Sequence, residues 1–156
     1  MAAGKWKIYQ VSKLYLFDGT FDLDDATNWR LGLYLSTSNA NTLTHASPIL
    51  ATLTNEHANA NGYTTGGLAI TPTWTQSGGT ATFDSTDPQW TASGGSIVAR
   101  FGVIYKNATV NSIVKPLLAV SLLDTTPADV TATTGNTFTV TMNASGVFTA
   151  SGADVD

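Results

Sequence analysis

From residue 68 onward, turn residues divide the chain into short segments that alternate between apolar and polar side chains. The segments that we predict to be strands are residues 68–76, 80–84, 89–92, 96–106, 113–123, 136–142 and 147–150. The breaks between them carry Gly, Asn, Asp or Pro, which turns need for a positive or a fixed φ. Turns spaced roughly 8–12 residues apart are typical of antiparallel sandwiches and barrels. We therefore predict a mostly β fold, either an antiparallel β-sandwich or a jelly-roll-like barrel.

Two segments have the pattern of core strands. Trp29, Leu31 and Leu33 alternate with more polar residues, which predicts a strand with one buried face. Residues 96–106 are apolar on both faces, so we expect a central strand that is covered on both sides.

The N-terminal segment predicts one short helix over residues 5–17. Ile8, Val11 and Tyr15 recur at helical spacing, Leu14 widens this apolar stripe, and Asp18 with Gly19 forms a stop signal. The β-branched and aromatic content leaves a strand as the alternative. We expect residues 1–19 to pack on the domain or on a partner, and residues 20–156 to form a single β-sandwich domain.

Two further segments are less regular. In residues 20–25, Phe21 and Leu23 alternate with aspartates, which predicts an edge strand with its charged face in water. A calcium loop does not fit, because Leu23 stands where such a loop needs glycine and no glutamate closes it. Residues 37–67 have almost no periodicity, so we expect an irregular insertion that is a functional loop or packs on a partner.

The composition excludes several classes of function. The 156 residues include 26 threonines, no cysteine and only 12% charged residues, with a net charge of −4. Disulfides and cysteine chemistry are thereby excluded, and the acidic balance argues against binding nucleic acid. No apolar run approaches the roughly 18 residues of a membrane span, and no secretory signal is recognisable. We expect a soluble protein made in the cytoplasm, with no membrane partner.

The side chains that carry catalysis are few. His45 and His57 lie in the irregular segment, where we interpret them as ordinary polar residues and not as metal ligands, and Glu56 is the only glutamate. We predict no catalytic, cofactor-binding or metal-binding residues, and no enzymatic activity. Trp74 alternates with threonines, so it belongs either to the core, which we favour, or to a sugar-binding platform.

Four segments resemble a group of small virion proteins of tailed bacteriophages. They are residues 60–67 (Ala-Asn-Gly-Tyr-Thr-Thr-Gly-Gly), 77–84 (Ser-Gly-Gly-Thr-Ala-Thr-Phe-Asp), 90–105 (from Trp90-Thr-Ala-Ser-Gly-Gly to Ile-Tyr) and 135–148 (from Gly135-Asn-Thr-Phe to Gly-Val-Phe). The lysine- and aromatic-rich start and the aspartates of residues 20–25 extend the likeness to nearly the whole chain. These motifs are turn and strand patterns, so no functional residue carries over from them.

The resemblance implies a structural virion protein, preferably a head decoration (cement) protein on the outer capsid surface. Its partners would be the major capsid protein and sister subunits, with a cyclic homotrimer favoured. A surface rich in Thr, Ser and Ala loses little side-chain entropy when neighbours cover it. The expected interface residues lie in the N-terminal and irregular segments: Trp6, Ile8, Tyr9, His45, Ile49, Leu50 and Tyr63. We also expect the sandwich to fold without residues 1–17.

Two other classes of function compete with this interpretation. A carbohydrate-binding or receptor-binding module of a tail or fibre would require exposed aromatic side chains. A glycan hydrolase would require two carboxyl groups that face each other across a cleft. The acidic residues that lie near one another in this sequence fall instead mostly in one short segment that we predict to be an edge strand, which argues against this class.

Overall fold

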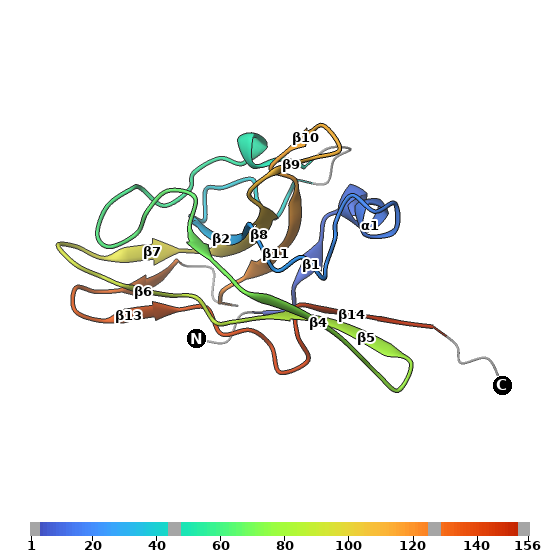
Figure 1. Cartoon of the computed structure of the whole chain (residues 1–156). Helices are drawn as coiled ribbons and strands as arrows, with labels where there is room; N and C mark the ends of the chain where they lie inside the picture. The colour runs from blue at the N-terminus through green and yellow to red at the C-terminus, as the bar shows by residue number, and fades with distance from the viewer. Residues whose placement is uncertain (1–3, 44–47, 125–128, 153–156) are drawn as a thin grey trace.

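A computed structural model describes residues 4–43, 48–124 and 129–152 of the chain. The largest sheet has five strands in the order β1 (Lys7–Ile8), β11 (Leu117–Leu122), β8 (Phe101–Lys106), β2 (Trp29–Tyr34) and β3 (Leu68–Ala69). A second sheet has the order β14 (Phe148–Ser151), β5 (Thr80–Ser85) and β4 (Pro72–Ser77). All of these neighbours are antiparallel. Figure 1 shows β4, β5 and β14 extending from the body toward the C-terminal end.

Short ladders and one helix complete the fold. β6 (Gln89–Thr91) pairs with β13 (Thr137–Thr139), β7 (Ile97–Ala99) with β12 (Val130–Ala132), and β9 (Thr109–Val110) with β10 (Ile113–Val114). The α-helix α1 spans Gln10–Phe17, and a 3-10 turn spans Leu50–Thr52. The mostly β, antiparallel fold with one short N-terminal helix is confirmed. No closed barrel forms among the described residues.

The main core lies between the two layers of strands. Trp29 of β2 packs against Phe83 of β5 with ring centroids 5.5 Å apart, so β2 and β5 meet across this core. Trp90 of β6 packs on Phe138 of β13 in the same cluster. Every residue of β8 is buried, as predicted for a central strand, although Arg100 separates β8 from β7.

The irregular segment covers the opposite face of the large sheet. Ala40 is buried in a second cluster with Tyr34 and Val103, and Leu43, Leu50 and Leu53 pack against that cluster. Residues of the segment 37–67 therefore pack on the chain's own sheet, which explains why β8 is buried on both sides.

The expected edge strand at residues 20–25 is wrong. No strand forms there, because the aspartate side chains accept hydrogen bonds from backbone N–H groups a few residues further along. Asp18 accepts one from Thr20, Asp22 from Asp24, and Asp25 from Thr27. Such turns compete with a strand ladder for the backbone donors.

The N-terminal segment is an integral part of the fold. Trp6, Tyr9, Ser12 and Tyr15 are all buried, and β1 pairs with β11. Removal of residues 1–17 would expose part of this core, which argues against the expectation that the sandwich folds without them.

Candidate functional site: an apolar groove beside helix α1

Helix α1 buries one face and exposes large apolar side chains on another. The Ser12 hydroxyl donates to the Leu117 carbonyl at 2.5 Å, and the Tyr15 ring packs edge-on against Phe21 at 5.8 Å. Leu14 is 60% exposed and Phe17 is 83% exposed. The prediction that Leu14 widens the buried stripe is thus wrong, because the helix contacts the sheet through a narrower face.

A row of aromatic rings crosses the three-stranded sheet opposite this helix. Register places Phe148 beside Phe83 and Phe83 beside Trp74 on adjacent strands. The Phe83 and Phe148 rings stack with centroids 5.3 Å apart, and the centroids of Trp74 and Phe148 are 6.0 Å apart. Phe83 is fully buried, whereas Trp74 and Phe148 are only partly buried. The margins of the row therefore remain accessible.

The helix and the aromatic row enclose a groove of about 230 Å³, which we call the α1 groove. Its walls are mostly apolar, and Lys13 is the only charged residue among those that line it. The lining residues are Ile8, Lys13, Leu16, Phe17, Leu23, Trp74, Phe148, Thr149 and Ala150. Apolar grooves are places where proteins commonly bind a partner or another ligand, so the α1 groove is the candidate functional site.

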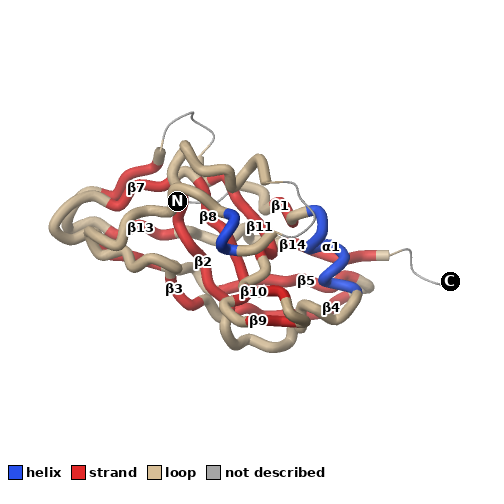
Figure 2. Tube along the Cα trace, turned by 90° about the horizontal axis from the view of Figure 1, so that it is seen from above, coloured by secondary structure: helices blue, strands red, loops and turns tan. Residues whose placement is uncertain are grey.

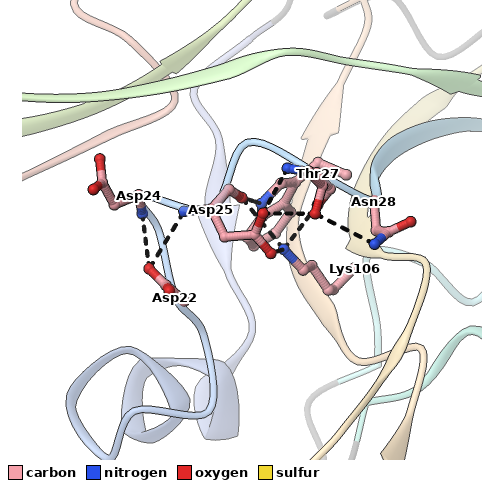
Figure 3. Close-up of polar contacts among 7 residues, drawn as sticks. Asp22, Asp24, Asp25, Thr27, Asn28 and Lys106 are labelled. Atoms are coloured by element: carbon pink, nitrogen blue, oxygen red, sulfur yellow. Dashed lines mark hydrogen bonds and ion pairs between the residues drawn. The ribbon is translucent and has the colours of Figure 1, made fainter.

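A more polar pocket of about 460 Å³ adjoins the groove on the other side of Leu16, Leu23 and Trp74. Asp22 and Asp24 line it and are exposed. One oxygen of Asp22 accepts the N–H groups of Asp24 at 3.1 Å and Asp25 at 3.3 Å (Figure 3). An indole ring with two exposed carboxylates nearby is an arrangement that can stack on a sugar ring and accept hydrogen bonds from its hydroxyls.

Asp25 has a structural role. Its carboxylate accepts a hydrogen bond from the buried Lys106 ammonium at 2.7 Å, and Lys106 also donates to the Thr27 carbonyl at 2.8 Å (Figure 3). The hydrogen bond from Lys106, with further ones from Thr27, holds the pKa of Asp25 well below its usual range. The ammonium lies 4.8 Å from the centroid of the Trp29 ring. These contacts anchor the turn before β2.

Glu56 belongs to a second buried polar cluster. The Tyr63 hydroxyl donates to Glu56 Oε1 at 2.6 Å and accepts the Leu33 N–H at 3.0 Å, and the Gly66 N–H also donates to Glu56 Oε1 at 2.6 Å. Burial raises the pKa of Tyr63 and lowers that of His57, whose ring packs edge-on against Tyr63 at 5.2 Å. The cluster holds part of the irregular segment on β2.

The structure separates the interface residues that we expected from the sequence. Trp6, Tyr9 and Tyr63 are buried within this chain, and the Tyr9 hydroxyl donates to the Ala40 carbonyl. Ile8, Ile49 and Leu50 are partly buried, and of these Ile8 lines the α1 groove. His45 lies outside the described residues. The interface role of these residues stays a prediction, and five of them (Trp6, Ile8, Tyr9, Leu50 and Tyr63) already contribute to this chain's own packing.

The groove residues that the sequence did not identify as a site include Leu16, Phe17 and Phe148. The run Leu14-Tyr15-Leu16-Phe17 contained a signal for two of them. Four consecutive apolar residues span all sides of a helix, so a helix packed on one side must expose part of that run. Phe148 gave no such signal, because its position beside Trp74 depends on a pairing between distant strands.

Among the described residues, no group of three or more His, Cys, Asp or Glu side chains is placed to hold a metal ion. Within the same part of the chain, no helix is long and apolar enough to cross a membrane. Comparisons with protein-family models, with curated proteins and with solved structures find no match to this chain.

Proposed function

We propose that the chain is a structural protein of a tailed-bacteriophage virion, a decoration protein that binds the major capsid protein and stabilises the head. The observation that carries the proposal is the α1 groove, with Phe17 and Leu14 exposed on the helix beside it. The resemblance of the turn and strand motifs to small phage virion proteins supports the same function. In this proposal the chain acts by binding and carries out no reaction.

The groove has the features of a docking surface in a permanent assembly. Aromatic side chains are enriched where protein interfaces are buried, and Trp74, Phe148 and Phe17 all reach the groove. Lys and Glu lose much rotamer freedom when they are covered, and Lys13 is the only residue of either type that lines this groove. A neighbour that covers the groove would therefore gain apolar burial at a low entropic cost.

The test is binding to heads that lack the protein. Purified chain is mixed with undecorated heads and sedimented, and occupancy is measured from the pellet. We expect Phe17→Asp to reduce occupancy strongly, because a carboxylate would enter the apolar contact. The matched control is Val114→Asp, since Val114 is also exposed, at 53%, but lies on β10. Occupancy that is the same for Phe17→Asp as for wild type would contradict the proposal.

A carbohydrate-binding module of a tail or fibre is the second candidate. The pocket that joins Trp74 with Asp22 and Asp24 favours it. Glycan-array binding that is present in wild type and lost in Trp74→Ala would support this candidate over decoration.

A further inference from the structure

Strand β14 leaves one border of the three-stranded sheet open. Among the described strands it pairs only with β5. Figure 2 shows from above how β14 runs out from the body toward the C-terminus. Thr149, Ala150 and Ser151 are exposed and uncharged. Natural proteins usually protect such an edge with charged side chains, proline or a covering segment, because its free backbone groups can pair with another chain.

The other border of the same sheet is better protected. β4 begins with Pro72, which has no N–H to donate. Asp22 and Asp24 share a pocket with Trp74 of this strand, so a second acidic chain would be repelled there. The contrast makes β14 the edge that is open to pairing.

The α1 groove runs along this open edge. Consecutive residues of a strand point to opposite faces, yet Thr149 and Ala150 both line the groove. The groove therefore extends from the face of the sheet that carries the aromatic row to the open edge of β14. An added strand would lie along this edge, beside Ile8.

We infer that the occupant of this edge is a second copy of the chain, paired antiparallel through β14 about a two-fold axis. A two-fold axis perpendicular to the sheet passes midway between a residue and its own symmetry mate, and Ala150 is the central residue of the exposed run. Thr149 of each copy then lies opposite Ser151 of the other. All of these side chains are small and uncharged, and the sheet continues across both copies with both α1 helices on the same side.

Charge favours a second copy over an unrelated strand. The chain is acidic, with a net charge of −4. Lys5 lines the pocket that contains Gly146, and Lys13 lines the α1 groove. Two basic side chains thus lie near the edge that an acidic second copy would approach.

This inference rests on the proposed function to the extent that both treat the α1 groove as a docking surface. It assigns the edge of the groove to a sister subunit. The homotrimer expected from the sequence follows from the symmetry of decoration sites, whereas an open, self-complementary strand edge favours a two-fold pair.

The experiment is sedimentation equilibrium of the full chain. We expect wild type to be a dimer and Ala150→Lys and Ala150→Glu each to weaken self-association by roughly tenfold or more, since like charges would lie directly opposite each other. Mixing the two variants should restore a one-to-one dimer, which also shows that both are folded. Thr75→Lys, on the exposed surface of β4, should leave the dimer intact.

Several results would overturn the inference. These are a wild-type monomer or trimer, a dimer that persists in both Ala150 variants, or variants that do not pair when mixed. Head binding distinguishes this failure from that of the proposed function. If the chain is a monomer that binds heads through Phe17, the dimer inference is wrong and the decoration proposal stands. If the chain is a dimer that does not bind heads, the decoration proposal is wrong and the dimer inference stands.

Discussion

Replacing Phe83 with alanine tests whether the aromatic row is structural at its centre and accessible at its margins. Phe83 is 0% exposed and contacts Trp29 of the opposite sheet as well as Phe148. Phe→Ala substitutions in cores cost about 3–5 kcal/mol, because apolar burial is lost and a cavity remains. For a chain of this size that loss lowers the melting temperature by about 6–20 °C.

Urea unfolding followed by tryptophan fluorescence measures this loss. The midpoint should fall while the slope with denaturant stays constant, which indicates an unchanged unfolding transition. Trp74→Ala is the matched control, because Trp74 belongs to the same row but is only partly buried. We expect Trp74→Ala to lower the free energy of unfolding by about 1–2 kcal/mol, since Trp74 buries a smaller fraction of its apolar surface on folding than Phe83 does. A Phe83→Ala loss no larger than that of Trp74→Ala would refute the assignment of Phe83 to the centre of the core.

Two further predictions concern the buried polar groups. Tyr63→Phe removes the hydroxyl that donates to Glu56 and accepts the Leu33 N–H, so urea unfolding should show that the free energy of unfolding falls by about 1–3 kcal/mol. The control is Tyr15→Phe, which should cost almost nothing because the Tyr15 hydroxyl has no hydrogen bond among the described residues. Equal losses in the two variants would contradict this account. Because the pKa of Asp25 is lowered in the folded state, its carboxylate stabilises the fold above its unfolded pKa of about 3.9, and this contribution is lost as the pH falls through the folded pKa. Wild type should therefore exceed Asp25→Asn in unfolding free energy at neutral pH, and the difference should shrink below about pH 4; a difference that is constant with pH would show that the carboxylate charge is not involved.

The sequence was informative wherever a local pattern decided the structure. The alternation of Trp29, Leu31 and Leu33 predicted β2, and apolar residues on both faces predicted the fully buried β8. The two-residue and three-residue strands were less predictable. β12 (Val130–Ala132) has too short a pattern to recognise, and it forms because its partner β7 lies beside it.

Two features of the structure were not predictable from local patterns, because segments compete for backbone donors and for buried surface. Asp18, Asp22 and Asp25 capture nearby N–H groups, so an alternating segment became a series of turns. Trp6 and Tyr9 looked like interface residues because they lie near the start of the chain. They are buried within this chain because β1 pairs with a strand more than a hundred residues away, which no local pattern indicates.

The distribution of charge at the two borders of the three-stranded sheet links the fold to the proposed assembly. Asp22 and Asp24 lie on the side of β4, whereas Lys13 and Lys5 lie toward β14. Lys106, by contrast, is buried and already bonded to Asp25, so it adds no charge for a partner. An acidic chain of net charge −4 repels its own copies over most approaches. The border at β14 combines basic side chains with an uncharged open strand, so it offers a sister subunit an approach without that repulsion.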